Sequence, residues 1–247
     1  MKNVRLLSLV VPAYKQEKTI VKDIQSLANV LSALPYRYEV IVVVDGFLDK
    51  TFEKAKSIKN NNIKVEGYKK NIGKGFAIRY GVEKAKGDVI GFIDAGMDID
   101  PNSILTLVKY MQTHNADIVI GSKLHPDSNV KYPLVRKILS WGYRNVVHLL
   151  FGLNVRDTQA GLKLFKKEVA KEIFPRLTVN TFAFDIETLV IAKKIGFNNV
   201  REAPVKVSFR RGTITNLNFF KIALIMLLDT ARVWVQLNIF NSYGKKK

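Results

Sequence analysis

The chain has 247 residues, and its 47% of hydrophobic residues is enough apolar material for one large core. It has no cysteine and three widely separated histidines, which excludes disulfides, thiolate metal sites and a histidine zinc cluster. The net charge of +19 indicates an anionic partner or a solvated lysine-rich surface; without a helix-turn-helix, zinc or RNA-recognition pattern, we expect no nucleic-acid partner.

Short apolar runs alternate with longer segments of mixed polarity through the first half of the chain. The runs predict strands at 6–12, 38–45, 62–68, 87–94 and 116–122. The segments between them predict helices at 17–33, 50–60, 74–86 and 102–114. We interpret the N-terminal run as a first strand and not as a signal peptide, because proline interrupts it and no cleavage site follows.

This alternation is typical of an α/β fold with a mostly parallel sheet, in which ligands bind at the carboxyl ends of the strands. Asp45 and Asp94 each end a predicted strand, so we expect them at that edge. Three acids follow the fourth strand in "FIDAGMDID". Asp100 precedes a proline at the start of a predicted helix and fits a helix cap, whereas the pattern leaves two interpretations open for Asp94 and Asp98, metal ligands or ordinary turn residues.

The positive charge is concentrated in the second half of the chain. Residues 1–130 contain 19 basic and 14 acidic side chains, and residues 131–247 contain 21 and 7. Two segments there, 131–152 and 217–240, have the pattern of amphipathic helices. The uncharged run at 222–228 is too short to cross a bilayer, so we expect a helix lying on an anionic membrane, with packing inside the domain or self-association as alternatives.

The stretch "NIGKGFAIRYG" (71–81) contains closely spaced glycines and two basic residues at the start of a predicted helix. It lacks the spacing of a P-loop. Gly73 and Gly75 would let the backbone approach a ligand, and Lys74 and Arg79 would suit a diphosphate, although a plain loop before a helix explains the stretch as well.

Four motifs together resemble family 2 glycosyltransferases of the GT-A fold: "VVPAYKQE" (10–17), "VVDGFLDKT" (43–51), "NIGKGFAIRYG" and "GDVIGFIDAGMDIDP" (87–101). Later motifs resemble the dolichyl-phosphate and polyprenyl-phosphate glucosyltransferases and mannosyltransferases. These are "IVIGSK" (118–123), "VRKILSWGYR" (135–144), "RDTQAGLKLFKKE" (156–168) and "FAFDIETLVIAKKIGF" (182–197), and "RDTQAGLKLF" favours the glucosyl branch.

The resemblance implies a GT-A domain at 1–215, with a nucleotide-sugar half at 1–122 and an acceptor half at 123–215. A membrane-interface helix and basic tail would follow at 216–247. The implied activity is inverting transfer of glucose or mannose from a UDP or GDP sugar to dolichyl or polyprenyl phosphate. The implied cofactor is Mg²⁺ or Mn²⁺, and the implied location is peripheral, on the cytoplasmic face of a membrane. Oligomers remain an alternative use of the apolar surface.

The resemblance also assigns residues. The nucleotide sugar would contact Pro12, Ala13, Tyr14, Glu17, Asp45, Lys74, Asp94 and Ala95. The acceptor phosphate would contact Lys123, Arg136, Ser140, Arg210 and Arg211. Asp94, Lys123, Arg136 and Gln159 would carry catalysis, and Asp94 and Asp98 would hold the metal. Asp157, Gln159 and Lys163 would border the sugar, with Asp185 and Glu187 orienting that wall.

Four positions depart from the family pattern. Val44 and Gly96 stand where the family has acids, Phe47 replaces a serine, and Lys123 replaces an arginine. Two alternative functions follow from these departures and from the acceptor chemistry. One is a family 2 transferase that uses a non-lipid acceptor, and the other is a protein that binds nucleotide sugars or anionic membranes without catalysis.

Overall fold

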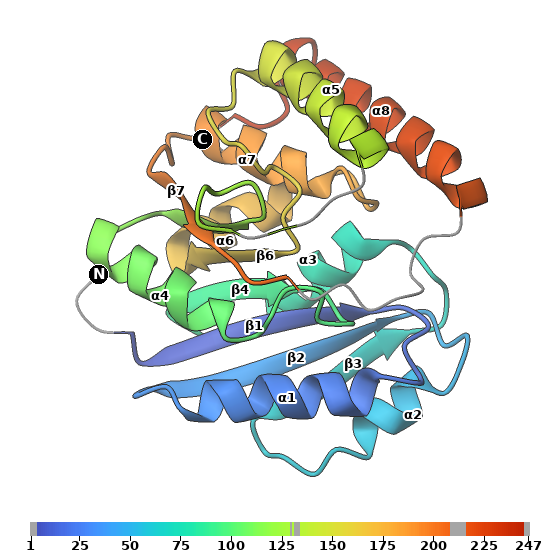
Figure 1. The fold of residues 1–247 in the computed structure, drawn as a ribbon, viewed down its shortest axis with the longest axis vertical. Helices are drawn as coiled ribbons and strands as arrows, with labels where there is room; N and C mark the ends of the chain where they lie inside the picture. The colour runs from blue at the N-terminus through green and yellow to red at the C-terminus, as the bar shows by residue number, and fades with distance from the viewer. Residues whose placement is uncertain (1–3, 129, 131–133, 208–215, 245–247) are drawn as a thin grey trace.

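The computed structural model describes residues 4–128, 130, 134–207 and 216–244, and it describes side chains there except at 134–140 and 216–223. A seven-stranded sheet crosses the molecule in the order β3-β2-β1-β4-β6-β5-β7 (Figure 1). Its strands are β1 (Leu6–Ala13), β2 (Arg37–Asp45), β3 (Ile63–Tyr68), β4 (Val89–Ile93), β5 (Ile118–Ser122), β6 (Leu162–Lys166) and β7 (Val200–Pro204). β6 runs antiparallel to β4 and β5, and the remaining pairs are parallel.

The α/β class and the five strands expected from the sequence are confirmed, but β6 and β7 were not among the expected strands. Their sequences, "LKLFK" and "VREAP", are five residues long and interrupted by charge, so neither has a clear strand pattern. β6 is a strand because it inserts between β4 and β5. The expected nucleotide-sugar and acceptor halves of the chain therefore share one sheet.

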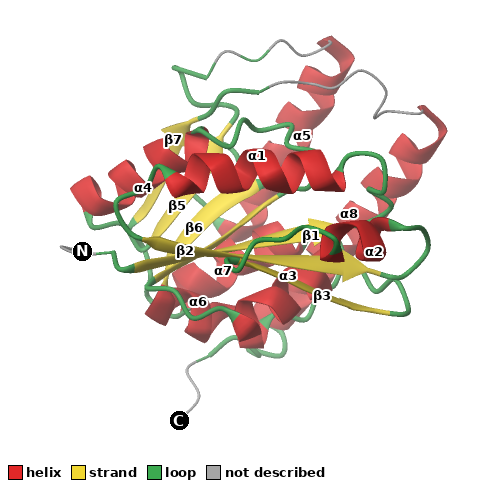
Figure 2. Cartoon of the chain, turned by 90° about the horizontal axis from the view of Figure 1, so that it is seen from below, coloured by secondary structure: helices red, strands yellow, loops and turns green. Residues whose placement is uncertain are grey.

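Helices cover both faces of the sheet, as Figure 2 shows. One face carries α1 (Ile20–Ser32), α2 (Thr51–Lys56) and α4 (Ser103–His114). The other carries α3 (Lys74–Lys84), α6 (Lys167–Ile173) and α7 (Phe184–Lys194), and the 3₁₀ turn η1 (Phe174–Arg176) follows α6. Neighbouring strand residues point to opposite faces, so Val43 packs in one core and Val44 in the other.

Two long helices, α5 (Leu134–Phe151) and α8 (Asn216–Asn238), lie side by side at one end of the molecule (Figure 1). The hydroxyls of Tyr143 and Thr230 join them through a hydrogen bond of 2.7 Å. Val233 and Tyr243 are buried in the domain core, so the C-terminal segment is partly integrated with the domain. Among the described residues, no helix is both long and apolar enough to cross a membrane.

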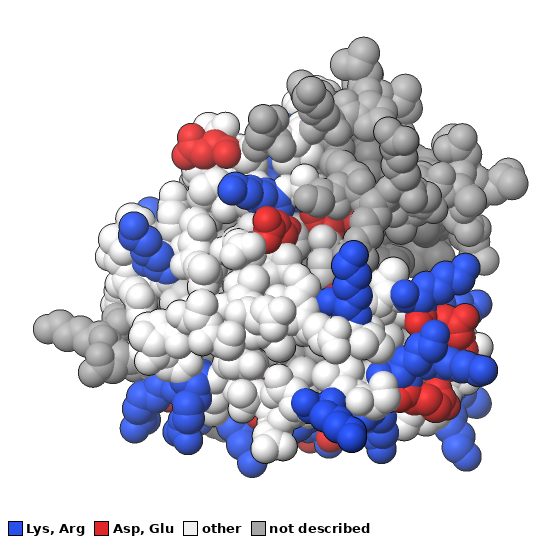
Figure 3. All heavy atoms as spheres, turned by 60° about the horizontal axis from the view of Figure 1, so that its bottom comes forward, with Lys and Arg blue, Asp and Glu red and all other residues white. Residues whose placement is uncertain are grey.

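The outer surfaces of α5 and α8 are unusually apolar. Leu149 is 85% exposed, Leu228 is 62% exposed and Trp141 is 58% exposed. On a different face, shown in Figure 3, lysine and arginine side chains lie mostly along the lower and right margins, with acidic side chains among them. The positive charge on that face therefore does not form one uninterrupted patch.

Candidate active site

The strand register brings the predicted donor residues to one edge of the sheet. Pro12 and Ala13 at the end of β1 pair with Val43 and Val44, directly before Asp45. Val10 pairs with Phe92, which places Asp94 and Ala95 just beyond the end of β4, beside β1. The carboxyl ends of three strands therefore meet at the position predicted from the sequence.

Asp45 is buried, and its carboxylate holds the loop that precedes α3. The Asn71 side-chain amide donates to it at 2.6 Å, and the backbone N–H groups of Ile72 and Gly73 donate at 2.8 and 3.0 Å. These contacts occupy both carboxylate oxygens. Asp45 thus fixes the shape of this loop from the end of β2.

The two glycines of this loop allow close packing against another part of the protein. The N–H groups of Gly75 and Phe76 both donate to the carbonyl of Asn180. A Cβ at Gly75 would lie 2.7 Å from the Cβ of Phe184, so no side chain fits there. Because the first amides of α3 already have protein acceptors, the structure favours the packing interpretation of these glycines over a backbone cradle for phosphate.

Arg79 is also engaged within the protein. Its guanidinium donates to the carbonyl of Leu177 at 2.6 Å and to the side-chain oxygen of Asn180 at 3.4 Å. Arg79 thus anchors the segment after η1, and its contact with a diphosphate stays a prediction. Lys74 is then the cation of this loop that faces the strand ends.

Lys74 reaches the end of β4 and pairs with Asp94. Its Nζ lies 2.7 Å from Asp94 Oδ1 and about equally far from the Phe92 and Phe184 rings, at 6.0 and 5.7 Å from their centroids. Burial disfavours the charged amine, but the carboxylates of Asp94 and Asp185 outweigh it and raise the pKa of Lys74. The site therefore keeps a fixed positive charge beside a carboxylate that is 43% exposed.

A second ion pair lies beneath the first. Lys163 on β6 is completely buried and donates to the carboxylate of Asp185 on α7 and to the carbonyl of Ala160. Burial lowers the pKa of Lys163 and raises that of Asp185, since both charges have left water. Asp185 links this pair to Lys74 electrostatically. Positive and negative charges thus alternate from the buried Lys163 through Asp185 and Lys74 to the partly exposed carboxylate of Asp94.

Gly161, which the sequence analysis did not select, directly supports Asp94. Its carbonyl accepts the Asp94 N–H at 3.0 Å, and a Cβ at this position would lie 2.8 Å from Asp94 Cγ. A glycine just before a short strand is the sequence signal that could have identified such a close approach.

The substitution Gly161→Ala should displace the Asp94 carboxylate and sharply reduce the transferase activity that the sequence resemblance implies. We expect a stability loss of about 1–3 kcal/mol from the added methyl group. Gly142→Ala is the matched control, because a Cβ there meets no atom within 4 Å and alanine favours a helix. Initial rates and thermal unfolding of both variants provide the measurement, and equal rates for the two would refute the supporting role of Gly161.

The turn after β4 explains the glycine among the acids. The Met97 N–H bonds the Asp94 carbonyl at 3.4 Å, and Gly96 has a φ of 87°, as the third position of a type II turn requires. An aspartate here would be strained in the left-handed region. The N-cap of α4 is Asn102, so Asp100 is not the helix cap expected from the sequence. The Asp100 carboxylate instead accepts the Asn102 N–H at 2.9 Å and holds the turn that precedes the helix.

The predicted Mg²⁺ or Mn²⁺ site fits this arrangement only if the substrate supplies some of the metal ligands. Among the described residues, no group of three or more His, Cys, Asp or Glu is gathered to hold a metal. Mg²⁺ is commonly held by one or two carboxylates together with substrate phosphates and water. The partly exposed Asp94 fits that role, with a diphosphate supplying other ligands, and the participation of Asp98 stays a prediction.

Two other predicted donor residues lie in loops beside the strand ends. Tyr14 is exposed, and the Glu17 carboxylate accepts the Lys50 N–H at 3.1 Å, which joins the loops after β1 and β2. The Phe47 ring packs at a tilt against Phe52, with ring centroids 4.5 Å apart, and lies against Gly67 on β3. The departure from serine at Phe47 therefore has a packing role.

The structure describes only some of the residues predicted to contact the acceptor. The Lys123 N–H donates to Asp157 at 2.8 Å, and burial raises the pKa of the Asp157 carboxyl despite the lowering effect of Lys123. Gln159 Nε2 lies 3.9 Å from Met226 Sδ on α8, which brings the two elements together. Two other predicted residues, Arg210 and Arg211, lie outside the described residues. Arg136 and Ser140 lie on α5, where the structure describes the backbone but not their side chains.

Glu187 has a structural role in this region. Its carboxylate accepts hydrogen bonds from the Thr178 N–H and hydroxyl, the Val179 N–H and the Tyr243 hydroxyl. It therefore supports the segment that contacts Gly75 and connects it with the C-terminal residues, and the expected role in orienting the sugar wall stays a prediction.

Comparisons with known proteins identify the class. The Glycosyl transferase family 2 profile matches residues 8–174, and the chain belongs to this family of glycosyltransferases. The resemblance found in the sequence is thus confirmed, and the fold described above is that of a family 2 enzyme.

Two similar proteins within this family are dolichyl-phosphate beta-glucosyltransferases. Dolichyl-phosphate beta-glucosyltransferase ALG5A of Trichomonas vaginalis is 32% identical over 98% of this chain and 75% of the relative. A Dolichyl-phosphate beta-glucosyltransferase of Dictyostelium discoideum is 31% identical over 92% of this chain and 73% of its own length.

Solved structures share the fold at lower identity. Glucosyl-3-phosphoglycerate synthase from Mycobacterium tuberculosis, in complex with Mn²⁺, UDP and phosphoglyceric acid, has a TM-score of 0.70 and 19% identity, covering 98% of this chain and 80% of that chain. Mannosyl-3-phosphoglycerate synthase from Rubrobacter xylanophilus has a TM-score of 0.71 and 16% identity, covering 94% and 74%. These likenesses confirm the GT-A type of fold.

Proposed function

We propose that this glycosyltransferase moves a hexose from a nucleoside diphosphate sugar to dolichyl or polyprenyl phosphate at a membrane surface. The observation that carries the proposal is the Lys74 and Asp94 pair at the carboxyl ends of the strands. A fixed cation and a carboxylate accessible to a metal ion suit a diphosphate leaving group. The dolichyl-phosphate glucosyltransferases named above support the acceptor.

UDP-glucose is the donor that we propose first. The relatives are named glucosyltransferases, and a structural neighbour was solved with UDP. Val44 is buried in the core where the family has an acid, and the neighbouring Asp45 already accepts several hydrogen bonds from the 71–73 loop. We therefore assign Asp45 to shaping the donor loop, with Pro12, Ala13, Tyr14 and Glu17 beside the nucleotide.

The transfer needs no general base on the protein. A phosphate monoester has its second ionisation near 6, so the acceptor oxygen is anionic near neutral pH. It attacks the anomeric carbon on the face opposite the diphosphate, the bond to the diphosphate breaks, and the configuration inverts. Lys74 holds positive charge near the departing phosphate. A Mg²⁺ or Mn²⁺ ion held by Asp94 would neutralise further charge on the same group.

The protein must also hold the acceptor in line with the sugar. Lys123, next to Asp157, lies at the end of β5, and α5 follows it with Arg136 and Ser140. We assign the acceptor phosphate to these three residues together with Arg210 and Arg211. Gln159 lies between β6 and α8, where it can border the sugar.

A panel of UDP and GDP sugars, incubated with a polyprenyl phosphate and Mg²⁺ or Mn²⁺, tests the proposal. The expected result is a glucolipid from UDP-glucose that requires the lipid phosphate. Transfer to soluble sugars alone would favour a non-lipid acceptor, and binding of UDP-glucose without any product would favour a non-catalytic binding protein. Either outcome would refute the proposed function.

We further propose that the exposed apolar side chains of α5 and α8 rest on a membrane, with the cytoplasmic face as the expected side. Tryptophan and leucine on neighbouring helices suit an interface where one side is apolar and the other wet. This would bring a lipid-linked phosphate to α5 without a spanning helix.

Replacing Leu149 and Leu228 together with aspartate should therefore reduce binding to anionic lipid vesicles by about tenfold or more, because two apolar contacts are lost. Sedimentation with vesicles gives the bound fraction. Leu105→Asp, on α4 at a more weakly exposed position, is the control and should bind as the unmodified protein does. Equal binding by the double variant would contradict the membrane orientation.

A further inference from the structure

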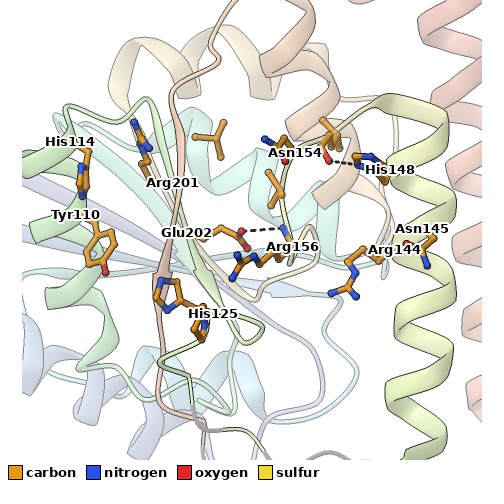
Figure 4. A pocket seen from close by; sticks show the side chains of 14 residues that line it. Tyr110, His114, His125, Arg144, Asn145, His148, Asn154, Arg156, Arg201 and Glu202 are labelled. Atoms are coloured by element: carbon orange, nitrogen blue, oxygen red, sulfur yellow. Dashed lines mark hydrogen bonds between the residues drawn. The ribbon is translucent and has the colours of Figure 1, made fainter.

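A cavity of about 720 Å³ lies along β7, between the end of α4, the loop after β5 and the second half of α5 (Figure 4). Its volume is within the range of small-molecule sites. β7 is three places from β4 in the sheet order, so at the usual strand spacing the cavity is roughly 14 Å from the strand that carries Asp94. It is therefore separate from the pair that defines the donor site.

The lining of this cavity is strongly basic. All three histidines of the chain contribute to it, from three different elements, together with three arginines. These six residues are His114, His125, His148, Arg144, Arg156 and Arg201. In Figure 4 the Arg156 side chain lies between those of His125 and Arg144.

Glu202, the acidic residue in the lining, forms its hydrogen bonds with backbone groups and not with an arginine side chain. The Glu202 carboxylate accepts the backbone N–H groups of Arg156 and Asp157 at 3.1 and 3.0 Å. Within the described part of the chain, neither the Arg144 nor the Arg156 guanidinium forms a salt bridge. Two planar groups that suit phosphate oxygens are thus left for a ligand.

Two of the histidines are held in place by hydrogen bonds. His148 Nδ1 lies 3.0 Å from the carbonyl of Leu153, which can only accept, so the ring donates through Nδ1. The Asp127 N–H donates to His125 Nδ1 at 3.2 Å, so a neutral His125 carries its proton on Nε2. Nε2 of His125 can then donate a hydrogen bond to an anion, while the Asp127 N–H from the same loop holds the ring in place.

We propose that this cavity binds a phosphate-bearing anion at a site distinct from the donor site. Arg144 and Arg156 supply the main contacts, and His125 adds a hydrogen-bond donor. The same chemistry would recognise a free phosphate compound or the headgroup of an acidic phospholipid, because α5 also carries the exposed Trp141 and Leu149. The proposal does not depend on the sugar, the acceptor or catalysis.

The histidines provide a readout confined to this cavity, because the chain has no others. Side-chain histidine resonances of the ¹³C-labelled protein are followed by NMR during titration with inorganic pyrophosphate. A second titration uses water-soluble, short-chain phosphatidic acid, and short-chain phosphatidylcholine serves as the ligand control. Pyrophosphate bound only at the donor site would leave these resonances in place.

We expect saturable shifts with pyrophosphate for a site that takes free phosphates, or with phosphatidic acid alone for a headgroup site. The double variant Arg144→Gln and Arg156→Gln should weaken the apparent affinity by about tenfold or more. A matched double variant, Lys22→Gln and Arg37→Gln, removes the same charge from exposed positions elsewhere and should titrate as the unmodified protein does. Absence of saturable shifts with both anions, or equal weakening in both double variants, would overturn the proposal.

Each variant is first checked by thermal unfolding. Arg156 is exposed and its backbone contact to Glu202 does not involve the side chain, so Arg156→Gln alone should keep the fold. If the double variant does not fold, this single variant carries the comparison with Arg37→Gln. Unchanged affinity in Arg156→Gln would then overturn the proposal equally.

Discussion

The Asp94→Asn variant should lose glycosyl transfer by about a hundredfold to a thousandfold, the usual effect of removing one fixed group that stabilises developing charge. Asparagine keeps the size of the side chain but removes the charge that pairs with Lys74 and would attract a metal ion. Because the Asp94 side chain is 43% exposed and Lys74 retains Asp185 nearby, the melting temperature should change little. Rates at several Mn²⁺ concentrations provide the measurement.

Asp100→Asn is the matched control for this experiment. The same substitution there preserves a side-chain oxygen for the Asn102 N–H, so activity should be unchanged. UDP binding by Asp94→Asn, measured by calorimetry, should become weaker and less dependent on the metal. Transfer that stayed within a few-fold of the unmodified protein would refute the assignment of Asp94 to the reaction.

The Lys163→Met variant should have the largest effect on stability. The substitution leaves Asp185 buried without its cation, which typically costs about 3–5 kcal/mol. For a chain of this size, a loss of about 3 kcal/mol lowers the melting temperature by roughly 6–12 °C. Thermal unfolding followed by circular dichroism gives the shift directly.

A second substitution separates the buried charge from simple loss of packing. Lys163→Met combined with Asp185→Leu removes both charges and should recover most of the lost stability. Lys84→Met, at an exposed pair with Glu66 whose charged atoms lie 3.7 Å apart, should change stability by only about 0.5 kcal/mol. A double variant no more stable than Lys163→Met would show that the ion pair is not the source of the effect.

The donor edge of the site followed from local patterns in the sequence. Buried runs ending in Asp45 and Asp94 predict parallel strands, and parallel strands present their carboxyl ends together. The partners of these acids could not be predicted in the same way. Lys163 and Asp185 are 22 residues apart and meet only because β6 lies between β4 and β5 with α7 packed against them.

The same contrast applies to the glycines. In the sequence, Gly73 and Gly75 suggested a backbone that approaches a ligand, but the structure brings Asn180 and Phe184 against them. The position of Gly161 just before β6 could have indicated a close approach, and only the structure shows that its neighbour is Asp94. A glycine pattern indicates that another group approaches the backbone closely, and only the folded structure shows whether this group is a ligand or another segment of the protein.

The sequence by itself determined the α/β class, the family and the strand ends that carry the residues we propose for the donor. These depend on short-range periodicity and on motifs that stay together in the chain. Only the tertiary structure decided the antiparallel insertion of β6, the buried chain of alternating charges and the basic cavity beside β7. Those features join residues far apart in sequence, and hydrogen bonding between strands, packing and desolvation of charge act on them only after the chain has folded.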